Sequence, residues 1–428
     1  MDAALNKIRT GFFARHETFA PRYGWLKKGF DGVAGALPDQ LDEWAESPPR
    51  PTGDDSPNPP NPQTDIPPST PSQPPPDPAV FDRPDAIEIL GVGKNMVRSI
   101  RFWCMAFHLI EPEKNPDSPR VSGPMRTTAL GRALLAEGGW DPYLEDPASL
   151  WLLHWKLFAP PIVAPAWSIA VNGAAASGFS AKDLARRFID YARDVPEFGR
   201  LSASSFEKDA SCFVRMYAPP AAGKRGGDEI ECPFTQLGFL VPAETKGHFR
   251  FHAGEKPDLP DLVFLAACLD FAANRGGING AERSGRSKGS AESAPADRSG
   301  NGGGMDDRLD GGPRGGSKTL SLGAVAYEWN GPGRVFQLSE TDIGHRLERA
   351  AAGREDLIFT ESYGHRQLQF FEDPADLRDR LLAEYYARTT DRTTDRSAAP
   401  FENGFETRLD AGRESRSETG LKAGRGAA

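Results

Sequence analysis

The sequence lacks the features that mark secreted, membrane and zinc-binding proteins. Its four cysteines, Cys104, Cys212, Cys232 and Cys268, are far apart and form no C-x-x-C pair, so we expect buried thiols and no structural zinc site. No run of about 18 apolar residues exists, the length that a membrane helix needs. Residues 1–7 lack the basic start and apolar stretch of a signal peptide. The sequence therefore predicts a cytoplasmic protein without a membrane span.

Two kinds of chemistry are also poorly represented. Gly91-Val-Gly93-Lys94 does not have the spacing of a Walker phosphate loop, so nothing indicates ATP binding. No cysteine lies in a clearly cationic loop, which argues against sulfur chemistry by the chain itself, and Cys232 beside Pro233 is the one thiol to test.

The net charge of −9 disfavours coating of nucleic acid through bulk charge. Much of that acidity lies in one spacer, so charge must be read segment by segment.

Glycine (45 residues) and proline (38) are abundant and concentrated in stretches without hydrophobic periodicity. Such composition cannot bury enough apolar surface to offset the entropy of ordering. We therefore predict three disordered segments: a proline-rich insertion at residues 38–79, a Gly/Ser-rich linker at 274–318 and a tail at 389–428. Four ordered pieces remain between them.

Residues 90–110 are the most informative part of the ordered chain. Residues 84–90 predict a short helix, and Gly91 and Gly93 supply a tight turn before a second helix. The second helix has an apolar stripe at Val97, Ile100, Cys104 and Phe107 and a basic face at Lys94, Arg98 and Arg101, with Asn95 beside it. A helix with one face that packs against the core and another that contacts DNA phosphates is typical of a DNA-binding helix-turn-helix. An ordinary amphipathic helix with a solvated charged face is the alternative.

The order of elements predicts a mainly α fold with small β wings, of the α+β class. Residues 110–132 indicate a hairpin wing leading back into a helix, and residues 26–36 supply a first helix. We therefore expect a winged helix-turn-helix domain from residues 1–37 plus 80–160, because an insertion between its helices costs little loop-closure entropy. Residues 161–273 predict a mostly helical middle domain. Residues 319–388 predict a helix, turn, helix and hairpin that resemble a second winged helix.

Several blocks of residues resemble one bacterial and archaeal protein family. The most specific are 15–19 with 22–28, and 90–97 with Trp103; further blocks are 140–147 with 150–155, 231–238 and 331–336. Together they resemble the SspB-like family of proteins associated with DNA phosphorothioation in anti-phage defence. The resemblance covers all four ordered pieces in order. The long insertions at 38–79 and 274–318 depart from it and leave open whether every partner contact is kept.

The resemblance implies a cytoplasmic protein that acts on double-stranded DNA, in a system that replaces a non-bridging phosphate oxygen by sulfur. Its implied partners are a cysteine desulfurase, an ATPase and an ATP pyrophosphatase-type sulfurtransferase. Nicking DNA requires a nucleophile, stabilisation of a negatively charged phosphorane and a leaving-group acid, commonly with Mg²⁺ or a similar ion such as Mn²⁺ held by carboxylates.

Arg15, His16 and Glu17 form the candidate catalytic or phosphate-clamping cluster. A carboxylate beside a histidine can hold the ring in one tautomer, and cationic side chains can contact phosphate; the other candidates for that contact in this region are Arg22, Lys27 and Lys28. The alternative is a structural ion-pair network in which His16 is hydrogen-bonded to backbone.

We therefore expect a DNA-binding component of a phosphorothioation defence system that nicks DNA to allow sulfur incorporation. A non-catalytic DNA-binding adaptor that recruits the sulfur-transfer enzymes, or a transcriptional regulator, is the alternative.

Overall fold

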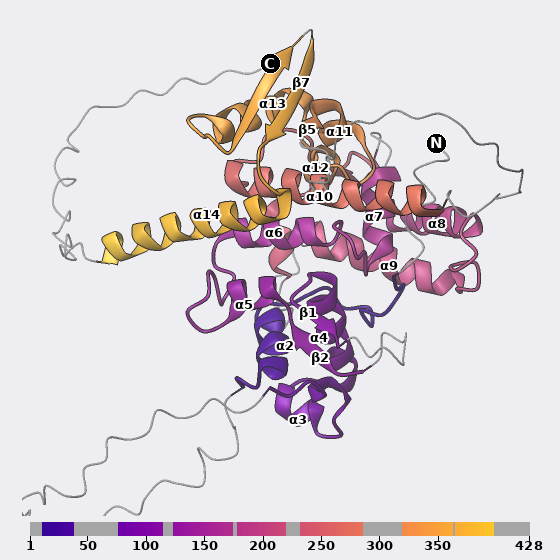
Figure 1. The fold of residues 1–428 in the computed structure, drawn as a ribbon. Helices are drawn as coiled ribbons and strands as arrows, with labels where there is room; N and C mark the ends of the chain where they lie inside the picture. Colours follow the sequence, from indigo (N-terminus) through magenta and orange to yellow (C-terminus); the bar gives the residue numbers. More distant parts are fainter. Residues whose placement is uncertain are drawn as a thin grey trace, which may run out of the picture. The chain divides into compact units, whose positions relative to one another are not determined.

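The chain folds into short helices and small antiparallel sheets, which confirms the predicted mainly helical α+β class (Figure 1). The computed structural model describes residues 11–37, 76–113, 123–173, 178–219, 232–285, 319–362 and 364–397. The described residues up to Ala387 form one unit around a continuous hydrophobic core. The division into three ordered domains stays a prediction. No helix within the described ranges is long and apolar enough to cross a membrane.

The short helix and the longer helix predicted on either side of Gly91 are present near the start of the described chain. They are α3 (Ala86–Leu90) and α4 (Lys94–Ala106), and they pack against α2 (Trp25–Ala34) and the short 3₁₀ helix η1 (Val80–Asp82) (Figure 1). Gly91 ends α3 with φ of 59°, a left-handed conformation that glycine adopts without strain. The predicted apolar stripe of α4 is fully buried from Val97 to Phe107, whereas Arg98 stays exposed.

A small hairpin and a further helix follow α4, as the sequence predicts. Strand β1 (Ile110–Pro112) pairs antiparallel with β2 (Met125–Thr127), and α5 (Ala129–Leu135) begins directly afterwards. The hydroxyl of Thr128 caps α5 by accepting a hydrogen bond from the Gly131 amide. Gly131 is needed there because a side chain would collide with the Leu109 carbonyl oxygen. This close approach fixes α5 against the hairpin.

The middle of the chain is mostly helical, as expected. Its elements are α6 (Pro147–Lys156), α7 (Pro165–Gly173), α8 (Ala181–Arg193), α9 (Ala203–Tyr217), η2 (Pro233–Leu237), β3 (Leu240–Pro242), β4 (Phe249–Phe251) and α10 (Asp261–Gly285). The aromatic residues of α6 are core residues: Trp151 and Trp155 are fully buried, and buried His154 bonds the Tyr217 hydroxyl and the Val335 carbonyl. Burial lowers the pKa of His154 to about 4, so the ring is neutral.

The last part of the described chain contains a three-stranded sheet. Its elements are β5 (Thr319–Ser321), α11 (Leu322–Tyr327), α12 (Pro332–Phe336), α13 (Glu340–Ala351), β6 (Leu357–Ser362), β7 (His365–Phe370) and α14 (Pro374–Ser397). The strand order is β5-β7-β6, with both pairs antiparallel. Ser339 and Asp342 form a capping box that starts α13.

Three boundaries differ from the predictions. The linker predicted from residue 274 begins inside α10, which continues to Gly285, and the tail predicted from residue 389 begins inside α14, which continues to Ser397. A helix that is already nucleated extends at little cost, even through residues without apolar periodicity. The turn predicted at residues 331–336 is the short helix α12, started by Pro332 at its first position. The insertion predicted at 38–79 lies outside the described residues except for its last four positions.

Candidate nucleic-acid interface

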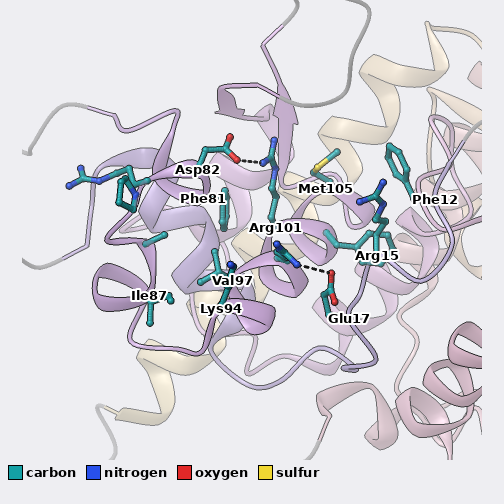
Figure 2. Close-up of a pocket in the computed structure, with 15 residues that line it drawn as sticks. Phe12, Arg15, Glu17, Phe81, Asp82, Ile87, Lys94, Val97, Arg101 and Met105 are labelled. Atoms are coloured by element: carbon teal, nitrogen blue, oxygen red, sulfur yellow. Dashed lines mark hydrogen bonds and ion pairs between the residues drawn. The ribbon is translucent and has the colours of Figure 1, made fainter. Parts of the chain in front are cut away.

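A groove of about 900 Å³ runs along α4, between the loop at residues 12–17 and the segment at 81–87 (Figure 2). Helix α4 contributes residues 94, 97, 98, 101, 102 and 105 to its lining, which all lie on one helical face. The groove has both apolar and charged surface. Phe12, Phe81, Ile87 and Met105 lie among five cationic side chains and two carboxylates.

The predicted basic face of α4 lies in this groove. Lys94 makes no ion pair among the described residues, and Arg98 lies 3.7 Å from the Glu17 carboxylate (Nη1 to Oε1). Arg101 is more constrained, because its Nη1 lies 2.9 Å from Asp82 Oδ1 and its Nη2 donates to the Gly123 carbonyl at 3.1 Å. Figure 2 shows these two ion pairs as dashed lines, one ending at Asp82 and the other at Glu17. The exposed fraction of the side chain falls from 57% at Arg98 to 18% at Arg101, so the groove is more enclosed toward the carboxyl end of α4.

The wall formed by residues 12–17 continues into a strained loop. Ala14, Glu17 and Thr18 have φ angles of 58°, 48° and 68°, in the left-handed region that residues with a Cβ rarely adopt. Each such residue costs about 1–3 kcal/mol and persists only where the surroundings fix it. Arg15 and Glu17 project from this loop into the groove, with the Arg15 guanidinium 5.9 Å from the centre of the Phe12 ring.

A buried pair, His16 with Asp209 of α9, fixes this loop. The His16 Nδ1 accepts the Thr18 amide at 3.1 Å, so the ring carries its proton on Nε2 and donates it to Asp209 Oδ1 at 2.9 Å. Asp209 Oδ2 accepts the Ala14 amide at 2.8 Å. The pair therefore satisfies the backbone of two of the three left-handed residues.

Both members of this pair are inaccessible to solvent. His16 is 0% exposed, and both of its ring nitrogens are occupied. Burial raises the pKa of Asp209, and the hydrogen bond from His16 offsets part of that rise. Of the three predicted catalytic residues, Arg15 and Glu17 thus reach the groove, whereas His16 points into the core. The backbone contact of His16 matches the structural alternative derived from the sequence.

The other predicted DNA-contacting residues lie outside the groove lining. Arg22 lies over Phe19 and Trp25, with its guanidinium 5.4 and 5.3 Å from the ring centres. Lys27 bonds both carboxylate oxygens of Asp31 at 2.6 and 2.7 Å. Half-buried Lys28 lies near Gly91, and exposed Asn95 lies in the first turn of α4. Their role in DNA binding stays a prediction.

Several residues of this region carry no sequence signal that marks them. Phe12, Phe81 and Met105 are single apolar residues that reach the groove from three different segments. Arg83 is also in the lining, but it bonds Asp85 and Asp77. Asp209 is 193 positions from His16 and lies on an otherwise ordinary amphipathic helix, so only the three-dimensional structure brings the two together.

The donor set for a metal is small in the part of the chain that the structure describes. No group of three or more His, Cys, Asp or Glu side chains that could hold a metal ion occurs there. The two groove carboxylates, Glu17 and Asp82, each lie beside an arginine. Because Mg²⁺ usually binds one or two carboxylates together with water and substrate phosphates, Glu17 and Asp82 are the oxygen donors that the groove offers to such an ion.

The four cysteines are all buried and free, as the sequence predicts. Burial raises the pKa of each thiol above its usual value, to about 12 for Cys232. None of the four lines the groove.

Comparison with known proteins agrees with this architecture. Residues 13–43, 71–279 and 312–386 match the family model "Protein of unknown function (DUF4007)". A crystal structure of magnesium-bound SspB is 29% identical, with a TM-score of 0.66 over 95% of this chain and 94% of that one. A second SspB crystal structure is 30% identical, with a TM-score of 0.64 over 91% and 97% of the two chains. No curated protein matches the chain. The chain therefore belongs to the DUF4007 family and resembles SspB in both sequence and fold.

Proposed function

We propose that this chain is the DNA-binding component of a DNA phosphorothioation defence system and that it nicks DNA so that sulfur can be installed. The observation that carries the DNA-binding part is the convergence of Lys94, Arg98 and Arg101 with Arg15 on one groove. Cations arranged along a groove bind the phosphate backbone and release its condensed counterions. The likeness to SspB supports the proposed system.

We assign the contact with double-stranded DNA to the unit that contains α4. The order α2, α3, α4 and the β1-β2 hairpin is that of a winged helix, in which α4 would be the recognition helix. The order β5-β7-β6 around α11 and α13 supports a second winged helix. However, α13 exposes the acidic Glu340 and Glu348, which repel phosphate. That unit would therefore serve contacts other than DNA, with the proposed partners: a cysteine desulfurase, an ATPase and an ATP pyrophosphatase-type sulfurtransferase.

For nicking, we assign roles to the two members of the predicted cluster that reach the groove. Arg15 would stabilise the charge that develops on the attacked phosphate, and Glu17 is the candidate general base. His16 would act as a positioning residue through Asp209 and the loop backbone.

Purified protein incubated with supercoiled plasmid tests the nicking proposal. We expect conversion to the relaxed form in buffers with Mg²⁺ or Mn²⁺, and loss of that conversion in Glu17→Gln. If the plasmid stays supercoiled across metals and salt concentrations, the nicking proposal is wrong. The adaptor function then remains. A regulator would instead bind its own promoter in preference to other DNA.

The DNA-binding proposal is tested with Lys94→Ala and Arg98→Ala. Each replacement is expected to weaken affinity for all sequences alike and to reduce the slope of log affinity against log salt by about one. Arg101→Ala is expected to change the slope less, because Asp82 already neutralises this guanidinium. Fluorescence anisotropy of a labelled duplex at several salt concentrations measures both quantities.

Arg186→Ala and Arg193→Ala on α8 are the matched controls, because both side chains are 71% exposed and lie outside the groove. Equal slopes for the α4 variants, the α8 variants and the unmodified chain would exclude α4 as the DNA contact.

A further inference from the structure

The shape of the groove restricts which part of a DNA molecule can enter it. The cationic face of α4 forms its floor, while residues 12–17 and 81–87 form walls on both sides (Figure 2). A helix that reads bases in the major groove must project between the two DNA backbones, in a space roughly 12 Å wide. Beside the carboxyl half of α4 the walls would meet those backbones first, whereas Arg98 nearer the amino end stays open to a duplex. The enclosed part of the groove therefore suits a ligand narrower than a duplex.

The chemistry of the lining changes along the groove. At the amino end of α4, exposed Lys94 and Arg98 offer charge to phosphates. Toward the carboxyl end, α4 contributes Phe102 and Met105 to the lining, which also includes Phe12 and Arg15. Aromatic and apolar side chains next to cations are the combination with which proteins bind unpaired bases and their phosphates. The volume of about 900 Å³ lies within the roughly 300–1,000 Å³ of small-ligand sites.

The wall that bears Phe12 and Arg15 is pre-positioned by contacts within the protein. The loop that begins at Ala14 has left-handed residues that the buried His16–Asp209 pair fixes in place. A side chain on a pre-positioned wall loses less entropy on binding than one on a mobile loop. Strain of this kind is found where a backbone must present a side chain at a set place.

We propose that the groove binds one unpaired deoxynucleotide of a DNA strand, with its base against Phe12 and Met105 and its flanking phosphates on Arg15 and Arg98. This proposal rests on the proposed DNA-binding function and adds the class of substrate: DNA that is locally single-stranded, such as a bulge or a frayed site. The base is recognised through its ring face, so the site is tolerant of base identity.

The test compares three labelled substrates of equal length by fluorescence anisotropy: an intact duplex, the same duplex with one bulged 2-aminopurine, and the same duplex with an abasic bulge. We expect the bulged base to bind roughly tenfold more tightly than the intact duplex, because base stacking on an aromatic ring contributes that much. The abasic bulge should lose most of this gain. The emission of 2-aminopurine should change on binding, since it depends on stacking.

Phe12→Ala should reduce the preference for the bulged base over the intact duplex to less than about threefold. Phe12→Leu keeps a similar apolar volume and is the second variant in case Phe12→Ala misfolds. It should lose the change in 2-aminopurine emission. Phe371→Ala is the control, because this phenylalanine is 53% exposed and outside the groove.

The outcomes separate the two proposals. Equal affinity for intact, bulged and abasic substrates, with binding still dependent on Lys94, overturns the nucleotide site and keeps DNA binding by α4. No dependence on Lys94 or Arg98 in any substrate overturns the proposed function itself.

Discussion

Asp270→Ala is expected to lower the free energy of unfolding by about 3–5 kcal/mol, the cost of leaving a buried charge without its partner. The Asp270 side chain is 5% exposed. Its Oδ2 accepts hydrogen bonds from Lys156 Nζ at 2.7 Å and Trp155 Nε1 at 2.8 Å, and its Oδ1 accepts one from Arg378 at 2.7 Å. Removing the carboxylate leaves the donors of α6, Trp155 and Lys156, unsatisfied in the core.

Urea unfolding followed by tryptophan fluorescence measures this loss. Asp270→Asn keeps an acceptor for Trp155 but removes the charge, so it separates the ionic part of the effect from the hydrogen bond. Asp190→Ala is the control, because its ion pair with Arg193 is exposed and should contribute less than about 1 kcal/mol. A loss in Asp270→Ala no larger than in this control would mean that the buried cluster does not stabilise the fold.

The difference in stability between the unmodified chain and Asp270→Asn has a defined pH dependence. Burial would raise the pKa of Asp270, but the charges of Lys156 and Arg378 outweigh it and hold this pKa well below its usual range. A carboxyl group with a lowered pKa contributes stability that is present above its unfolded pKa, near 3.9, and is lost as the pH falls through the folded value. We therefore expect the stability gap between the unmodified chain and Asp270→Asn to be constant above roughly pH 5 and to narrow below roughly pH 4. A gap that widens in acid would contradict this assignment.

Asp209→Asn is expected to destabilise the chain by about 1–3 kcal/mol and to weaken DNA binding as well. Asp209 accepts hydrogen bonds from two donors, the Ala14 amide and the His16 Nε2–H. An asparagine has one acceptor oxygen and one donor amide, so it must turn a donor toward one of them. His16 cannot change tautomer to compensate, because its Nδ1 already accepts the Thr18 amide. The left-handed loop then loses part of its support, and Arg15 loses its place in the groove.

Urea unfolding and DNA anisotropy on the same preparations check both effects. Thr18→Gly added to Asp209→Asn should regain stability, because glycine tolerates the φ of 68° at this position, yet it should not regain DNA affinity. Recovery of both properties together would show that the affinity loss came from global instability and not from the position of Arg15.

The parts of this structure that sequence reasoning predicted well are those fixed by local rules. The 3.6-residue period places Val97 in the core and Arg98 in solvent, whatever the rest of the chain does. Gly91 ends α3 because a left-handed residue is needed there. Capping by Ser339 similarly starts α13. Each of these depends on neighbours within one or two turns, so a single sequence contains the information.

The candidate site was only partly predictable because its geometry depends on distant residues. Nothing near His16 indicates that it bonds to Asp209, and without that bond the ring would be a reasonable base in a DNA-binding loop. The walls of the groove likewise join Phe12 and Phe81, which are separated in sequence by a long insertion. Sequence patterns identified Arg15 and Glu17 as candidate catalytic residues. They could not give the direction in which each side chain of the cluster points.

The four buried cysteines have a consequence for how sulfur would travel in the proposed system. A persulfide forms on an ionised thiol that a donor can reach, and burial raises the pKa of these four thiols and hides them from any donor. Cys232 is only 8% exposed. Sulfur would therefore pass from the desulfurase to DNA through the other components only. This chain would prepare the recipient strand without carrying sulfur itself.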